Sequence, residues 1–183
     1  MIPITPGTLL ISDPFLKDPN FLRTVLILCE HEPGSSLGFI LNKRHELSFN
    51  SLLPNLMHVD LPVYFGGPVQ PDSLHFLHQK PDLIEGGLLL SDGIFWGGHF
   101  EQAIELLKNN LLKNNDIRFF IGYSGWGNGQ LEEELKEKSW IMSRPSCRMT
   151  FENNPAHLWK DALKNLGGEY SQMANYPIDP QLN

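Results

Sequence analysis

The sequence contains little cysteine and no long hydrophobic run. Its two cysteines, Cys29 and Cys147, are too few for a disulfide framework or a cysteine-rich metal site. No segment approaches the ~20 consecutive apolar residues that a membrane helix requires. The N-terminus lacks the basic start and apolar stretch of a signal peptide. We therefore expect a cytoplasmic protein with no disulfide, no cofactor and no membrane contact.

Positive charge is also scarce. The chain has 14 Lys and Arg residues against 21 Asp and Glu, a net charge of −7, and only Lys43 and Arg44 form an adjacent basic pair. Affinity for nucleic acids depends on clustered basic residues. The composition therefore argues against a nucleic-acid partner and leaves a protein or a small molecule. The oligomeric state stays open.

Short strands and helices alternate with many turns. Apolar, β-branched runs predict strands at residues 9–11, 25–29, 37–42, 62–65, 74–78, 88–90 and 117–121. Apolar spacing and capping residues predict helices at residues 48–57, 99–113, 129–138 and 154–166. This order is typical of an α+β fold with a mainly antiparallel sheet. We expect a single α+β domain over residues 1–168, and a tail at 169–183 that lies along the surface or frays.

The most informative stretch is residues 122–130, where a hydrophobic strand enters a glycine-rich turn that opens an acidic helix. Glycines allow backbone N–H groups to approach a ligand at the positive end of a helix. In the structural alternative, glycine supplies positive φ angles while Tyr123 and Trp126 pack onto the sheet. The segment lacks the Lys-Ser/Thr of a phosphate-binding loop.

Two further features are candidates for the same cleft. Gly66-Gly67-Pro68 ends a strand, and is either a second wall or a tight turn. Arg23 interrupts an apolar run, and either binds an anion or pairs with Asp13, Asp18 or Glu30. The candidate ligand- or partner-binding residues are Arg23, His31, Asn42, Gly66, Gly67, Pro68, Tyr123, Ser124, Gly125, Trp126 and Gln130.

Signals for catalysis and metal binding are weak. Ser124 lies in Gly122-Tyr123-Ser124-Gly125, one residue short of a Gly-x-Ser-x-Gly nucleophile elbow. It could act with His31 or His78 only if the fold brought them together. His75 and His78 on one strand would point to opposite faces, so we expect no metal site. The prediction is a non-enzymatic binding or regulatory protein with a cleft at the glycine-rich strand ends. The alternative is a small-molecule hydrolase or transferase using Ser124 or His31.

Several short motifs occur in order across residues 7–140. They are Gly7-Thr8-Leu9-Leu10-Ile11-Ser12, Arg23-Thr24-Val25, Glu30-His31, Gly38-Phe39-Ile40-Leu41-Asn42, Gly66-Gly67-Pro68-Val69, Phe76-Leu77-His78 and Gly122-Tyr123-Ser124-Gly125-Trp126. Together they resemble the bacterial AlgH/YqgE family, with a departure at His99, where an acidic residue is more usual. The resemblance implies a compact α+β fold with a barrel-like sheet and helices packed around it. It implies no catalytic residues, and one family branch carries the label of transcriptional regulator, linked to alginate production. Only this label suggests a third hypothesis, a direct DNA-binding regulator, against which the charge balance argues.

Overall fold

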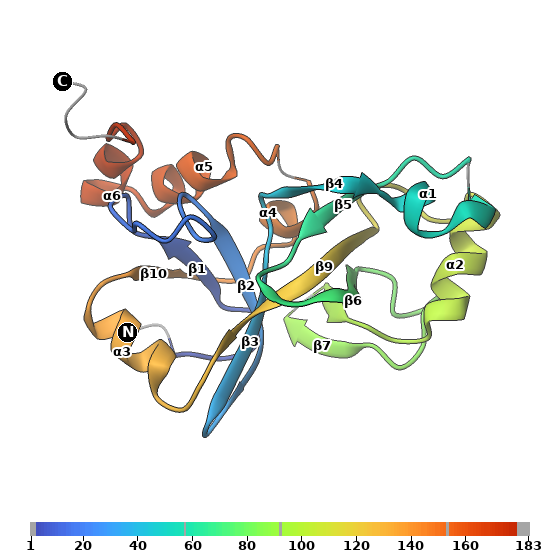
Figure 1. The fold of residues 1–183 in the computed structure, drawn as a ribbon, viewed down its shortest axis with the longest axis horizontal. Helices are drawn as coiled ribbons and strands as arrows, with labels where there is room; N and C mark the ends of the chain where they lie inside the picture. The colour runs from blue at the N-terminus through green and yellow to red at the C-terminus, as the bar shows by residue number, and fades with distance from the viewer. Residues whose placement is uncertain (1–2, 57, 92, 153, 179–183) are drawn as a thin grey trace.

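The computed structural model describes residues 3–178 except 57, 92 and 153. The strands are β1 (Leu9–Ser12), β2 (Val25–Glu32), β3 (Ser35–Ile40), β4 (Arg44–Ser48), β5 (Pro62–Phe65), β6 (Val69–His78), β7 (Leu88–Ser91), β8 (Ile94–Trp96), β9 (Ile117–Trp126) and β10 (Trp140–Ser143). The helices are α1 (Phe49–Leu52), a 3-10 turn (Pro54–Leu56), α2 (Phe100–Lys108), α3 (Gln130–Lys136), α4 (Cys147–Phe151), α5 (Leu158–Leu166) and α6 (Gly168–Met173). Figure 1 shows α1 and α2 at one end of the molecule, and α3, α5 and α6 at the other.

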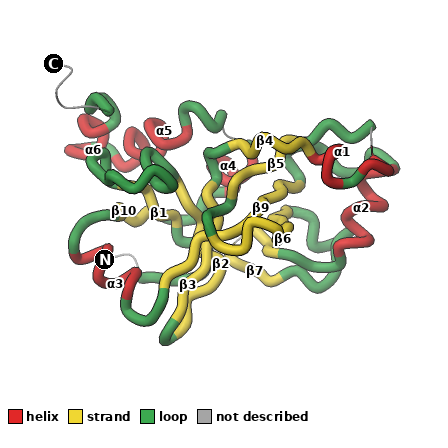
Figure 2. The backbone as a smooth tube through the Cα atoms, viewed as in Figure 1, coloured by secondary structure: helices red, strands yellow, loops and turns green. Residues whose placement is uncertain are grey.

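The strands form one sheet that forks along β9. The main order is β10-β1-β2-β3-β9-β6-β8-β7, and β4 and β5 branch from β9. Near its end β9 pairs with β3, where Ser36 faces Trp126. Nearer its start the strand pairs in parallel with β5, where Val63 faces Phe119, and it pairs with β6 as well. The long strand β9 therefore belongs to both halves of the sheet, as Figure 2 shows.

The mainly antiparallel α+β fold is confirmed, but the expectation of a barrel-like sheet is wrong because the sheet does not close. The strand at the end of the sheet order, β7, does lie close to the segment before β1. A Cβ atom added at Gly7 would lie only 2.8 Å from the carbonyl oxygen of Leu90 in β7. However, β1 already pairs with β10 on one side and with β2 on the other. With both edges of β1 occupied, β7 has no free strand to join.

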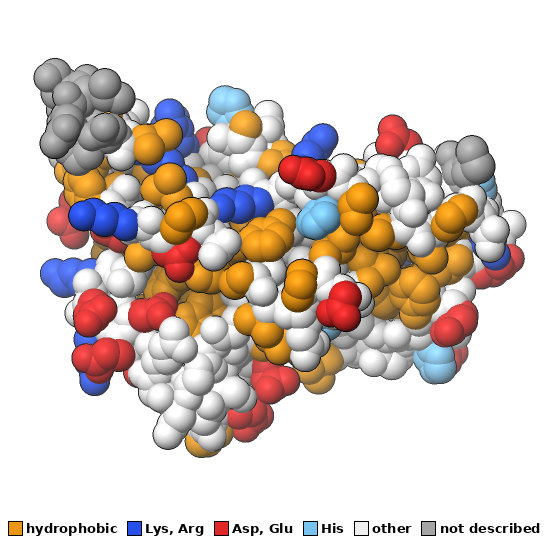
Figure 3. Space-filling view, in the orientation of Figure 1, with side chains coloured by type: hydrophobic (Ala, Val, Ile, Leu, Met, Phe, Trp, Pro, Cys, Tyr) orange, Lys and Arg blue, Asp and Glu red, His pale blue; other side chains and the backbone are white. Residues whose placement is uncertain are grey.

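Two apolar cores lie around the first half of β9. The larger one joins β1, β2 and β3 to α4 and α5, and includes Phe39, Phe120 and Trp159. The second packs β5, β6 and β9 against α1 and α2, and it includes Phe49 and Phe119, whose tilted rings have centroids 4.4 Å apart. Hydrophobic side chains at its margin stay half-buried, and Figure 3 shows such side chains gathered between the strands and α2.

A third core lies beneath α3. It includes Leu26, Ile40, Trp126, Leu131 and Trp140, which are all buried. In the part of the chain that the structure describes, no helix is long and apolar enough to cross a bilayer.

Arg118 is a charged residue buried in β9. Its guanidinium donates hydrogen bonds to the carbonyl oxygens of Leu41 (3.0 Å) and Phe151 (3.3 Å) and lies 4.3 Å from the centre of the Tyr64 ring. Desolvation lowers the pKa of Arg118 to about 10, so the group stays charged at neutral pH. Arg118 thus joins the end of β3, the end of α4 and β5 through one side chain.

Several element boundaries differ from the sequence prediction. The strand expected at residues 117–121 continues to Trp126, through the glycines assigned to a turn. The short strands β8 and β10 and the helix α4 were not predicted, because three to five residues are too few for a periodic pattern. The last long helix begins at Leu158 rather than near Asn154. The proposed domain boundary at residue 168 stays a prediction; residues 168–173 form α6, and Ala174 is buried.

We predict that Gly66→Ala destabilises the fold far more than Gly127→Ala. A Cβ atom at Gly66 would lie 2.2 Å from the carbonyl oxygen of Gly122, whereas at Gly127 the nearest atom is the Gln130 Oε1 at 4.0 Å. The backbone must shift in the first variant, at a cost of about 3 kcal/mol. Urea denaturation followed by circular dichroism measures both. Equal free energies of unfolding for the two variants would contradict the packing described here.

Candidate functional site

The two glycine motifs lie against each other, as the sequence suggested for two walls of one site. A Cβ atom at Gly67 would lie 2.2 Å from the carbonyl carbon of Tyr123, and one at Gly122 would lie 2.5 Å from the carbonyl oxygen of Gly67. The backbones are therefore in direct contact. Gly66, Gly67 and Gly122 are needed for this close approach, and backbone atoms fill the space where a cleft was expected.

Ser124 is part of the same contact. Its side chain is fully buried, and its hydroxyl donates a hydrogen bond to the carbonyl oxygen of Gly66 at 3.0 Å. A nucleophile must reach its substrate, and this hydroxyl faces the protein interior. In this structure Ser124 joins β9 to the end of β5.

Tyr123 and Trp126 lie on opposite faces of β9. Tyr123 packs against the largest core and its ring centre lies 6.0 Å from that of His75. Trp126 is buried in the core beneath α3. A Cβ atom added at Gly125 would lie 3.3 Å from the Tyr123 ring. A single ligand cannot contact both aromatic faces. The structural interpretation of Trp126 is favoured by its burial.

Glu134 in α3 holds the end of β9. Its Oε2 accepts hydrogen bonds from the indole N–H groups of Trp126 (2.9 Å) and Trp140 (2.7 Å). Its Oε1 accepts one from the Gln130 amide at 2.9 Å. Gln130 also accepts a bond from the backbone N–H of Gly127 at 3.0 Å. Gln130 therefore fixes the turn before the helix, and Glu134 joins α3 to two strands.

We predict that Glu134→Ala lowers the free energy of unfolding by about 2–4 kcal/mol, because two buried indole N–H groups lose a charged acceptor. The matched control is Glu133→Ala, which removes an exposed pair with Lys136 at 3.1 Å and should cost less than about 1 kcal/mol. Denaturation followed by far-ultraviolet circular dichroism separates the two. Similar losses in both variants would show that Glu134 does not hold α3 in place.

Arg23 and Asn42 form a separate group before the start of β2. The Asn42 amide oxygen accepts a hydrogen bond from the Val25 N–H, and its nitrogen donates to the Arg23 carbonyl, both at 2.9 Å. The Arg23 guanidinium lies 4.6 Å from the centre of the Trp159 ring and donates to the Tyr176 carbonyl. Asn42 thereby fixes the entry of the chain into β2.

The ion pair expected for Arg23 is not observed. Among the residues that the structure describes, Arg23 makes no salt bridge, and its partners are an aromatic ring and a carbonyl oxygen. Burial lowers the pKa of the guanidinium. Arg23 has a positive φ of 52° and lies in a turn just before β2, where its guanidinium contacts the Trp159 ring instead of a carboxylate, so the ion-pair prediction is wrong.

His31 lies near the other end of β2, about 20 Å along the strand from Val25. Its Nδ1 is 2.8 Å from the Ser36 hydroxyl oxygen, and its Nε2 is 3.8 Å from Glu132 Oε1. Neither Ser36 nor Glu132 is among the candidate residues named from the sequence. Cross-strand pairing in the predicted hairpin could have indicated Ser36, since Ser36 and His31 are paired residues.

The predicted opposite orientation of His75 and His78 is confirmed. His75 packs against Phe39, while His78 is fully buried and stacks on Phe95. Desolvation lowers the pKa of both rings. No group of three metal-ligating side chains occurs among the described residues.

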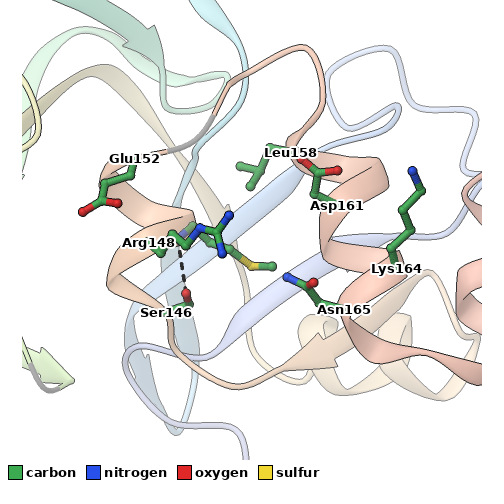
Figure 4. A pocket seen from close by; sticks show the side chains of 8 residues that line it. Ser146, Arg148, Glu152, Leu158, Asp161, Lys164 and Asn165 are labelled. Carbon is green, nitrogen blue, oxygen red and sulfur yellow. Dashed lines mark hydrogen bonds between the residues drawn. The ribbon is translucent and has the colours of Figure 1, made fainter.

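A cavity of about 440 Å³ opens between α4 and α5 (Figure 4). Its lining combines charged, polar and apolar side chains, and we call it the α4–α5 cavity: Ser146, Arg148, Met149, Glu152, Leu158, Asp161, Lys164 and Asn165. Three further cavities lie beside β4 and beside the loop after β1, and none of these four is lined by the candidate residues named from the sequence. Arg23, the glycine contact and His31 are thus three separate groups rather than one site.

The geometry defines a class of small α+β proteins with a forked, open sheet and two glycine motifs packed at the fork. A family model described as AlgH-like (DUF179) matches residues 9–171. The chain belongs to this AlgH-like family, and the resemblance inferred from the motifs is confirmed.

Relatives and solved structures agree with this assignment. A UPF0301 protein of Cytophaga hutchinsonii is 41% identical over 98% of this chain and 100% of its own length. One from Chlorobium luteolum is 43% identical over 98% of this chain and 95% of its own. The AlgH protein from Pseudomonas aeruginosa matches with a TM-score of 0.72 at 25% identity, covering 97% of this chain and 98% of that one. Protein DIP2367 from Corynebacterium diphtheriae matches with a TM-score of 0.82 over 96% and 94% of the two chains, and at 17% identity this likeness shows the fold alone.

Proposed function

We propose that this bacterial protein is a non-enzymatic binding protein that holds a partner protein along the outer edge of β7. The observation that supports the proposal is the exposure of an apolar edge strand. Leu88 and Leu89 are 54% and 57% exposed, and Leu83 in the preceding loop is 44% exposed. Side chains of this size are exposed together in few places on a soluble protein unless a partner covers them.

The backbone of β7 offers a second type of contact. The strand is last in the sheet order, so its outward N–H and C=O groups have no neighbouring strand. Gly7 contacts the far end of β7 at Leu90, which leaves the edge free at Leu88 and Leu89. An extended partner segment could add a strand here, with backbone bonds giving affinity and the leucines giving specificity.

In this proposal the glycine motifs do not bind the partner. Their contact holds the end of β5 against β9, and β9 in turn pairs with β6 and positions the β6–β8–β7 half of the sheet. The proposal thus retains the non-enzymatic binding function predicted from the sequence. It assigns that function to the edge strand β7 instead of the glycine-rich strand ends.

The test is Leu89→Lys, which places a charge on the edge, compared with Leu111→Lys, a residue that is 61% exposed in the loop after α2. Tagged wild-type and variant proteins are expressed in a bacterium that carries the protein, and co-purified proteins are quantified by mass spectrometry. We expect a partner that is retained by wild type and Leu111→Lys and reduced at least tenfold by Leu89→Lys. The same partners at the same yield in all three samples would refute the β7 site.

A second candidate function is hydrolysis, favoured by one specific observation. The contacts of His31 with Ser36 and Glu132 place a hydroxyl, an imidazole and a carboxylate in sequence. This is the arrangement of an activated nucleophile, a base and an orienting acid. Ser36 is buried, with 6% of its surface exposed, so the turn between β2 and β3 must move before a substrate reaches the hydroxyl.

Ser36→Ala tests this alternative, with the adjacent and exposed Ser35→Ala as its control. If the group is catalytic, the protein cleaves p-nitrophenyl esters, Ser36→Ala loses at least about a hundredfold in rate, and Ser35→Ala keeps it. Equal rates in wild type and both variants would eliminate the hydrolase.

A further inference from the structure

The α4–α5 cavity has the size of a small-molecule site. Its volume of about 440 Å³ falls within the range of roughly 300–1,000 Å³ that is usual for ligand pockets. One wall comes from α4 and the residues flanking it, and the other comes from one face of α5, where residues 158, 161 and 165 follow helical spacing. Both walls are therefore parts of ordered elements, which suits a preformed site.

The floor of the cavity is apolar. Met149 and Leu158 both line it and both are buried, since each also belongs to the largest core. A ligand that entered the cavity would contact these side chains with its apolar part.

Polar groups of both charges surround this floor. Figure 4 shows the Arg148 guanidinium and the Asn165 amide turned toward each other from the two walls, with the Asp161 carboxylate beside Leu158. Among the residues that the structure describes, neither Arg148 nor Asp161 forms a salt bridge. Two cationic side chains, Arg148 and Lys164, and two anionic ones, Glu152 and Asp161, thus line one small space, and Arg148 and Asp161 do not pair with each other across it.

This combination matches the chemistry of a free amino acid. A guanidinium and an amide N–H recognise a carboxylate, a carboxylate recognises an ammonium group, and an apolar floor recognises an aliphatic side chain. We infer that the α4–α5 cavity binds a free α-amino acid with an aliphatic side chain, its carboxylate on Arg148 and Asn165 and its ammonium on Asp161. This inference is independent of the β7 proposal.

The α4–α5 cavity is connected to the sheet through α4. The ligand joins α4 to α5, and α4 is held at its end by the hydrogen bond from Arg118 in β9 to the Phe151 carbonyl. Occupancy would therefore stabilise the position of α4 against the sheet, because anything that binds only the folded state stabilises it.

The first test uses wild-type protein and four probes in isothermal titration and in two-dimensional amide NMR. Leucine should bind and shift the signals of α4 and α5. N-acetyl-leucine lacks the ammonium, leucinamide lacks the carboxylate and glycine lacks the side chain, so each should bind at least tenfold more weakly. No saturable response to leucine, or equal affinity for all four probes, would overturn the inference.

The second test uses variants of exposed residues. Arg148→Gln and Asp161→Asn should each weaken leucine binding at least tenfold, while Lys160→Gln, on α5 outside the cavity, should leave it unchanged. Asp161→Asn should not weaken the residual binding of N-acetyl-leucine further, because that probe has no ammonium. If Lys160→Gln weakens leucine binding as much as Arg148→Gln, the effect is general electrostatics and the site is refuted.

Discussion

The pairing of β9 with three strands is the constraint on which the rest of the structure depends. One edge of β9 carries β6, and the other carries β5 and then β3. β5 and β3 can pair with successive parts of one edge of β9 only if the chain turns sharply away from β9 at the end of β5. Gly66 and Gly67 make this exit possible by letting the backbone lie directly on Gly122 and Tyr123. The glycines that mark the family are therefore requirements of the fork.

The same constraint explains why the sheet stays open. The fork divides the strands into a half that ends at β10 and a half that ends at β7. The first half ends at β10, whose Trp140 shares the Glu134 carboxylate with Trp126. The second half ends at β7, an apolar strand on which Leu88 and Leu89 are exposed. Among the described residues, one terminal strand is thus held by α3, and the other carries exposed leucines.

Much of the fold could be predicted from the sequence, because long apolar runs determine their own structure. Val25–Cys29 are fully buried as expected, and the strands at 37–42 and 62–65 were placed within two residues. The candidate site could be predicted less well. Glycine indicates positive φ or close approach equally, so the pattern at 122–126 did not distinguish a turn from a bulged strand in backbone contact.

The side chains of the α4–α5 cavity and the contacts of His31 could not be predicted from the sequence, for a different reason. Arg148 and Asp161 are thirteen residues apart, in helices whose mutual position depends on the sheet below them. Ser36 and Glu132 are brought to His31 by strand pairing and by the docking of α3. Such contacts depend on tertiary structure, and no local pattern of residue types records them.

The pairing of β1 with β10 has a consequence for how the chain reaches this state during synthesis. Leu9 pairs with Ser143, so the outer edge of β1 lacks its partner strand until the 134 residues that follow Leu9 have been synthesised. Contacts between such distant residues slow folding, because a large loop must close before they form. A nascent chain of this protein must therefore keep an apolar strand from aggregating while the ribosome is still working.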